Sequence, residues 1–231
     1  HVRRHTRRRV GVRLLPPRRR ELASIESLAQ EYLRSAGLPA TKPHEPVKVD
    51  PERGKRIAAA YDALPKFSRD SETLAAYSQF QREVEAQYDF LKEHIRFVHT
   101  AGDPYPDSKS MIADVRENRT LRVYMGGDPH PFLGKPGPDG LSANDKFRGV
   151  HDVFGHAMRG YQFGPSGEMN AYLEHSKMFG PLARKAMASE TLGQNSFFNF
   201  APQNIDKPPA QRQFAEQKAA LLPDEFLTGN L

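Results

Sequence analysis

Hydrophobic residues recur at intervals of three and four along most of this chain, which is the spacing of one face of an α-helix. Glycine and proline interrupt the pattern at several points: Gly37 ends the first repeat, and the proline-rich residues 38–50 indicate an extended connector. The pattern predicts a helix starting near Asn144 and others over residues 21–36, 51–64, 71–99, 110–116, 168–191 (kinked at Gly180-Pro181) and 210–222.

Only one segment alternates in the manner of a β-strand. Residues 121–125 read LRVYM, in which β-branched and aromatic side chains favour a strand. The loop that follows, residues 126–140, contains five Gly and four Pro, and long loops inside compact domains often serve function. The sequence therefore predicts a mainly α fold, an irregular and loop-rich helical single domain with one short β element.

Composition narrows the setting of this fold. The 231 residues are 38% hydrophobic, enough for one core, and no apolar run approaches the roughly 20 residues of a membrane span. Cysteine is absent, so disulfides, thiolate metal sites and cysteine nucleophiles are excluded. We expect a cytoplasmic protein without a membrane partner and, because the first 20 residues lack an apolar segment, without a secretory signal.

The net charge of +6 is concentrated at one end of the chain. Residues 1–20 contain nine Arg and no acid, whereas the remainder has 25 basic and 28 acidic residues. Such arms bind polyanions through phosphate contacts, so weak nucleic acid contact through residues 1–20 is one expectation, and a solvated tail is the other. We therefore divide the chain into an arm, 1–20, and a helical domain, 21–231.

The stretch VHDVFGH places His151 and His156 five positions apart on a predicted helix. Five positions on a regular α-helix separate two side chains by roughly 140°, so both could hold one ion only at a helix start or in a distorted turn. Gly155 lowers the resistance to such a distortion, or lets another backbone approach closely. The spacing excludes the HExxH zinc helix but leaves a metal site open, beside the alternative of two structural histidines.

A metal site here needs a carboxylate from another segment. The following helix offers Glu168, Glu174 and Glu190, and also His175. Two imidazoles and one carboxylate on one face of an ion, with open positions opposite, are typical of non-haem Fe(II).

The segment HDVFGH resembles the iron-binding segment of the aromatic amino acid hydroxylases, the pterin-dependent non-haem iron enzymes. The likeness extends over about residues 144–194, where Leu182-Ala183-Arg184 precedes Ser189-Glu190-Thr191-Leu192-Gly193. It implies that His151, His156 and Glu190 are the iron ligands; Glu168, Glu174 and His175 remain the alternatives that the helical pattern offers. It implies a pterin cosubstrate beside Asp152, which we take as the catalytic acid, and a largely helical domain. The interval from His156 to Glu190 is 34 residues, where the family has about forty.

Four further residues are candidates for substrate contact. Tyr105 lies in a turn-rich loop, and Arg148 flanks the histidine motif, where it could hold a carboxylate or phosphate or form a surface ion pair. Gln194 and Asn195 follow the proposed ligand segment, where they could orient a ligand or a substrate, or simply end a helix.

These features together favour a mononuclear Fe(II)-dependent oxygenase or hydroxylase that acts on a small or amino-acid-like substrate. Two alternatives remain. The same cluster could serve a zinc or manganese hydrolase, with an acid such as Asp152 or Glu174 as the base for a metal-bound water. The chain could instead be a helical interaction protein whose arginine-rich arm binds nucleic acid.

Overall fold

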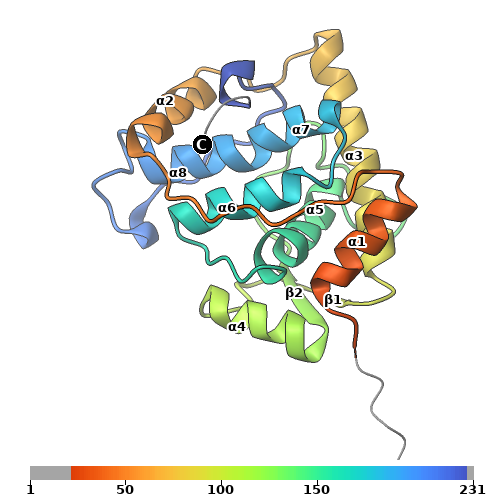
Figure 1. The fold of residues 1–231 in the computed structure, drawn as a ribbon. Helices are drawn as coiled ribbons and strands as arrows, with labels where there is room; N and C mark the ends of the chain where they lie inside the picture. Colours follow the sequence, from red (N-terminus) through yellow and green to blue (C-terminus); the bar gives the residue numbers. More distant parts are fainter. Residues whose placement is uncertain (1–21, 228–231) are drawn as a thin grey trace, which may run out of the picture.

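The computed structural model describes residues 22–227, and helices make up most of this range (Figure 1). The predicted mainly α fold is confirmed. The α-helices are α1 (Ile25–Ser35), α2 (Pro51–Asp62), α3 (Ser71–Leu91), α4 (Ser108–Ala113), α5 (Ala143–His151), α6 (Pro165–Ser176), α7 (Pro181–Ala188) and α8 (Gln194–Phe200). Three π-helical turns, η1 (Asp114–Asn118), η2 (Asp152–Ala157) and η3 (Ser189–Gly193), continue α4, α5 and α7, and η4 (Pro209–Gln211) and η5 (Asp224–Phe226) are single 3₁₀ turns.

The helices pack around two long helical rods, each of which contains a π turn. One rod is α5 followed by η2, and the other is α7, η3 and α8 in succession. Helix α3 packs against both α5 and α7, α6 packs against η2, and α2 packs against α8 (Figure 1). The π turns η2 and η3 thus lie in the middle of the molecule, where the two rods and α6 approach one another.

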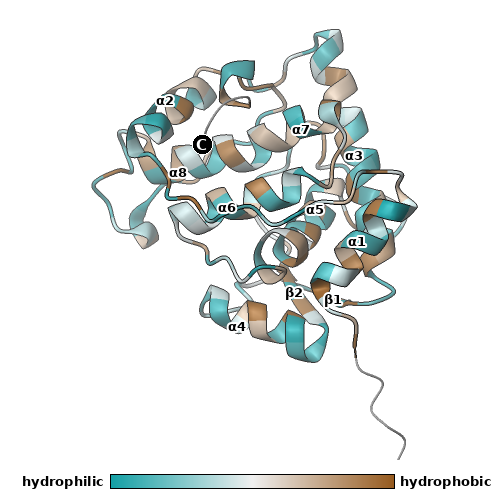
Figure 2. Cartoon of the chain, viewed as in Figure 1, coloured by the Kyte–Doolittle hydropathy of each residue, from teal (hydrophilic) through white to brown (hydrophobic). Residues whose placement is uncertain are grey.

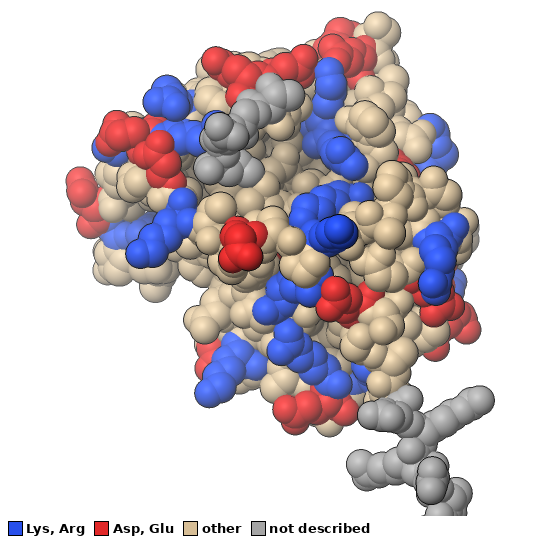
Figure 3. All heavy atoms as spheres, in the orientation of Figure 1, with Lys and Arg blue, Asp and Glu red and all other residues tan. Residues whose placement is uncertain are grey.

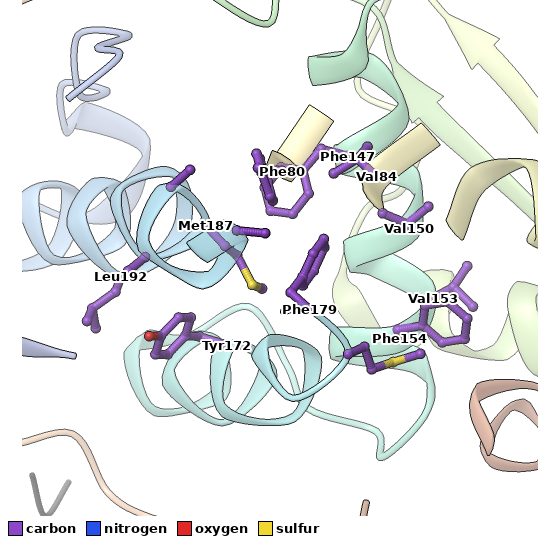
Figure 4. Close-up of a cluster of buried hydrophobic side chains, with 14 of the residues drawn as sticks. Phe80, Val84, Phe147, Val150, Val153, Phe154, Tyr172, Phe179, Met187 and Leu192 are labelled. Carbon is purple, nitrogen blue, oxygen red and sulfur yellow. The ribbon is translucent and has the colours of Figure 1, made fainter. Parts of the chain in front are cut away.

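The buried apolar side chains form one continuous cluster that extends from α1 to Phe226. Figure 4 shows its centre, where Phe80 of α3 and Phe147 of α5 meet Phe179. The ring of Phe80 lies 4.9 Å from that of Phe147 and 5.3 Å from that of Phe179. Hydrophobic and hydrophilic residues alternate along the helices in Figure 2, as expected where one face of each helix is buried.

The connector over residues 38–50 is extended, as predicted, and runs along α6 (Figure 1). Several of its backbone amides donate to side chains of that helix. The His44 N–H donates to Glu174 Oε1 at 3.1 Å, and the Val47 N–H donates to Asn170 Oδ1 at 2.9 Å. Burial of a backbone donor without an acceptor would cost about 1–3 kcal/mol, so these polar side chains hold the connector in place.

The helix predicted to run from Ser71 to about His99 ends instead at Leu91. Residues 96–100 form strand β1 (Arg96–Thr100), which pairs in parallel with β2 (Thr120–Tyr124). The segment RFVHT alternates and is rich in β-branched and aromatic residues, so it fits a pleated strand once a partner is present. The predicted strand is therefore one of a pair.

The helix predicted over residues 210–222 is also wrong. Apart from η4, this segment is extended, and Ala219 pairs with Phe67. The cause is tertiary: the buried ammonium of Lys218 donates to three carbonyls at and just beyond the C-terminal end of α2, those of Tyr61, Asp62 and Leu64, at 2.7–3.1 Å. A cation at this end satisfies free carbonyl groups and favours the helix dipole.

The predicted helix over 168–191 is divided. Helix α6 begins at Pro165 and ends at Ser176, and α7 begins at Pro181, so the expected kink at Gly180-Pro181 is a break between two helices. The second helix then continues beyond Thr191, through η3 into α8.

The face shown in Figure 3 carries acidic and basic side chains interspersed, without a large area of one sign. Between residues 22 and 227, no helix has both the length and the apolar character that a membrane span requires. The predicted nucleic acid contact of residues 1–20 lies outside the described residues.

Candidate metal centre

The five-residue spacing of His151 and His156 is resolved by the π turn η2. A π-helix closes i→i+5 hydrogen bonds, so residues five apart lie one above the other on the same face. The Met158 N–H donates to Val153 O at 2.9 Å and the Tyr161 N–H to His156 O at 3.1 Å, both with this interval. The distorted turn that the sequence required is therefore present, and the two imidazoles lie 5.2 Å apart, centroid to centroid.

A chain of hydrogen bonds fixes the tautomer of His151. The amide nitrogen of Gln87 donates to Met178 O at 3.1 Å, so Gln87 Oε1 faces His175 Nε2 at 2.7 Å and accepts its proton. Burial lowers the pKa of His175 well below its usual value, and His151 and His156 lower it further, so the ring is neutral and its Nδ1 is an acceptor. That nitrogen lies 3.0 Å from His151 Nδ1, which must carry the hydrogen.

The lone pair of His151 is consequently on Nε2. This atom is buried and has no hydrogen-bond partner among the described residues. A buried polar atom without a partner is rare in folded proteins and calls for an explanation such as an ion. The orphaned Nε2 atom is the observation that most directly indicates a ligand at this point.

His156 and Glu168 complete the group. The Nδ1–H of His156 donates to Tyr161 O at 2.8 Å, which leaves Nε2 to face Glu168 Oε2 at 3.2 Å. His151 Nε2 lies 4.0 Å from the same oxygen, and the three atoms are all within 4.8 Å of one another. Ligands of one ion at about 2.1 Å lie roughly 3 to 3.4 Å apart, so small side-chain movements would bring all three into contact with an ion.

The charges of this group are strongly coupled. Burial opposes protonation of His156, but the Glu168 carboxylate outweighs it and raises the pKa of His156 to about 9. Burial likewise opposes ionisation of Glu168, but the charge of His156 outweighs it, and the proximity of both imidazoles adds to this effect, so the pKa of Glu168 is lowered to about 2. The site is thus built around an ionised carboxylate that requires a positive charge beside it, which a proton or a metal ion can supply.

The hydrogen-bond chain behind His151 should control metal affinity. Gln87→Leu removes the acceptor of the His175 proton. His175 can then carry its hydrogen on Nδ1 and donate it to His151 Nδ1, which places the His151 hydrogen on Nε2, the atom that should bind the metal. Outer-shell partners of ligating histidines are worth about 10- to 100-fold in affinity, and we expect a loss in that range for Co²⁺ or Zn²⁺ measured by competitive titration.

Gln87→Glu is the matched control, since it retains an acceptor at the same place, and we expect it to keep most of the affinity. If both variants bind metal as the parent does and differ from it only in thermal stability, the hydrogen bonds from Gln87 through His175 to His151 have a structural role alone.

Glu190 is held away from this group by hydrogen bonds of its own. Tyr77 Oη donates to Glu190 Oε1 at 2.8 Å, and His130 Nε2 lies 2.7 Å from the same atom. His130 Nδ1 accepts the backbone N–H groups of Phe132 and Leu133, so the hydrogen is on Nε2 and His130 donates. The group that brings ligand atoms together within residues 22–227 contains Glu168, one of the alternatives, and not the preferred Glu190.

The other two alternative ligands have different partners. Glu174 binds the connector through the backbone of His44 and lies 3.6 Å from Lys177 Nζ. His175 touches the centre only through His151. Neither belongs to the three-residue group, and His175 acts behind a ligand and not as one.

The centre opens into a cavity of about 320 Å³, which Asp152, Glu190 and Tyr105 also line. Burial raises the pKa of Asp152 to about 7, and Glu168 adds to this effect while His156 and Arg148 oppose it. The Tyr105 hydroxyl is engaged already, because it donates to Asp114 Oδ2 at 2.7 Å and accepts the Arg122 N–H at 3.0 Å. The Tyr105 hydroxyl thus already has its donor and one acceptor position occupied within the protein.

The remaining predicted contact residues also line this cavity. Arg148 Nη1 donates to Tyr124 O at 3.0 Å and lies 3.5 Å from Asp145 Oδ1. Asn195 Nδ2 lies 3.2 Å from Glu168 Oε2, so it orients the proposed ligand, whereas Gln194 Nε2 donates to Glu190 Oε2 at 3.0 Å. Both amides begin α8 rather than end a helix.

Several residues of the site were not foreseen. Gln87 and Tyr77 lie on α3 and read as ordinary members of a long helix. His130 lies in the loop over 126–140, whose Gly and Pro content did indicate function, but the single histidine in it was not singled out. His130 was thus the one detectable signal among the three.

Comparison with known proteins gives no relative: no protein-family model, no curated protein and no solved structure matches this chain. The resemblance to the aromatic amino acid hydroxylases therefore stays a prediction, and the function has to be argued from the site.

Proposed function

We propose that this chain is a mononuclear metal enzyme that uses Fe(II) and O₂ to oxygenate a small organic substrate. The observation that carries the proposal is the convergence of the unpartnered His151 Nε2, His156 Nε2 and Glu168 Oε2 on one point inside a cavity. Two imidazoles and a single carboxylate that leave the cavity side open suit Fe(II) among the biological metals.

The residues present fit such an ion. Both histidines present Nε2 and have the other ring nitrogen hydrogen-bonded, His151 to His175 and His156 to Tyr161 O, as ligating histidines commonly do. Glu168 is ionised and is held by the amide of Asn195. His151, His156 and Glu168 would hold the ion, and an Fe(II) ion bound there supplies open positions at which O₂ can be reduced.

The surrounding chain provides what the reaction needs besides the metal. The phenyl ring of Phe163 stands edge-on to His156, with ring centroids 5.0 Å apart, and covers one side of the ligand. Asp152 faces the same cavity and can hold or move a proton, and the Arg148 guanidinium offers donors for a substrate anion. These groups would bind and orient a substrate beside the ion.

The test is metal content together with oxygen use. Full-length protein purified without oxygen and supplied with Fe(II) should bind about one ion per chain, whereas His156→Ala should bind none and keep the helical circular dichroism of the parent. Consumption of O₂ by the iron form on addition of a substrate supports an oxygenase. Tight Zn²⁺ or Mn²⁺ binding with hydrolytic activity and no O₂ uptake would favour the hydrolase, and iron retained by His156→Ala would refute the site.

A further inference from the structure

A second and larger cavity adjoins the metal cavity. It has a volume of about 610 Å³, against about 320 Å³ for the inner one. Seven residues line both, among them Tyr124, Arg148, Phe163 and Gln217, so the two spaces share a wall. A substrate whose reactive end lies at the metal can therefore extend outward past this shared wall.

The outer cavity is bordered by aromatic side chains that are exposed to solvent. Phe214 is 85% exposed, Phe163 44% and Tyr124 42%, and all three line it. Phe198 and Phe214 stack there with centroids 5.3 Å apart and an angle of 18°. Single exposed hydrophobic side chains are common on protein surfaces, but several aromatic side chains gathered at one cleft indicate a binding surface for an apolar ligand.

Arg148 stands between the two compartments with unused donors. Only its Nη1 atom is engaged, by Tyr124 O and Asp145, and Nε and Nη2 have no partner among the described residues. Gly127, which has a positive φ of 94°, passes close by, and a Cβ there would lie 3.5 Å from Arg148 Nη2. The guanidinium is thus held from one side and presents its remaining N–H groups to the cleft, where an anion can accept two of them.

We propose that the combined cleft binds an elongated organic anion, with its anionic group at Arg148 and its apolar body on Phe198, Phe214 and Phe163 in the outer cavity. The inference rests on the proposed function only for the direction of the reactive end. The anionic group can be a carboxylate or a phosphate, because a guanidinium binds either in a bidentate manner.

The proposal is tested by binding of simple probes to the full-length protein, metal-free and metal-loaded, by calorimetry. Decanoate should bind at least 100-fold more tightly than butanoate, because each buried methylene contributes about 0.8 kcal/mol or roughly fourfold. Decanol should bind more weakly than decanoate, and a comparison of decanoate with decyl phosphate shows which anionic group is preferred.

Two variants separate the contributions of charge and of apolar surface. Arg148→Gln should weaken decanoate and decyl phosphate at least tenfold and leave decanol within twofold. Phe214→Ala should weaken all three probes severalfold. The matched controls are Arg82→Gln, an exposed cation that lines neither cavity, and Leu182→Ala, an exposed apolar residue outside both.

The outcomes decide the matter independently of the metal. Equal affinity for butanoate and decanoate would refute the apolar body, and an unchanged affinity of Arg148→Gln for the anions would refute the anion site. If none of the probes binds, the inference as a whole is overturned. Because metal-free protein is included, these failures leave the iron stoichiometry, on which the proposed function depends, untouched.

Discussion

Glu168→Gln should abolish tight metal binding, whereas Glu190→Gln should leave it intact. Glu168 is the acid whose oxygen lies 3.2 and 4.0 Å from the two imidazole Nε2 atoms. A neutral amide in its place is a poor ligand and removes the negative charge that balances the ion. The loss should exceed the roughly 10- to 100-fold that outer-shell partners cost. Competitive titration with Zn²⁺ or Fe(II) under anaerobic conditions measures it.

The same pair of variants should behave in the opposite way toward stability. Glu190 accepts from Tyr77, His130 and Gln194, and only 2% of its side chain is exposed. An amide NH₂ at this position would face one of these donors, so we expect Glu190→Gln to lower the free energy of unfolding of the metal-free protein by about 1–3 kcal/mol. Metal loss in Glu190→Gln, with binding retained in Glu168→Gln, would exchange the two roles and restore the ligand set first predicted from the sequence.

The choice between these two acids shows where inference from the sequence ended. The two histidines and the list of acids were available from spacing and composition. What separates Glu168 from Glu190 is the environment of each, and the partners of Glu190 come from α3 and from the loop over 126–140, far away in the sequence. A ligand set cannot be ranked by local pattern when distant donors decide which carboxylate is free to turn toward the ion.

The spacing itself was a sound signal because it conflicts with a regular helix. Two residues five positions apart do not lie on the same face of a helix with 3.6 residues per turn. The hypothesis that His151 and His156 bind one ion therefore required a distorted helix, and η2 is such a distortion, a π turn. A second π turn, η3, carries Glu190 into the same cavity. The position of the distortion could be inferred from the residues, but its hydrogen-bond pattern could not.

The errors in the helix boundaries have the same physical origin. The segment after Leu91 keeps apolar side chains at spacings that suit a helix, yet it becomes a strand because β2 is there to pair with it. Residues 210–222 have a helical pattern, but the ammonium of Lys218 donates to carbonyl groups at the end of α2. This contact holds the segment in an extended conformation. Local propensity was overruled in both places by partners from another part of the chain.

Gly155→Ala should disrupt the centre without removing a single ligand. The ring of His151 lies directly against this glycine, and a Cβ at residue 155 would come within 2.9 Å of His151 Nδ1 and Cε1 and within 3.3 Å of Ala171 O. The ring is flanked by His175, and the carbonyl belongs to the backbone of α6, so neither can yield easily. We expect His151 Nε2 to be displaced, with metal affinity lowered at least tenfold and the free energy of unfolding lowered by about 1–3 kcal/mol.

Gly102→Ala is the control for this substitution, because a Cβ at residue 102 would meet no heavy atom within 4 Å. It should leave both affinity and stability as they are. The comparison also separates two meanings of the glycine. If Gly155→Ala lowers stability but binds metal normally, the residue is needed only for packing of η2 against α6. If it loses metal as well, the π turn requires glycine at this point because the His151 ring occupies the space that a side chain would fill. The five-residue spacing and the glycine within it then act together, since both are needed to orient the two imidazoles toward a single ion.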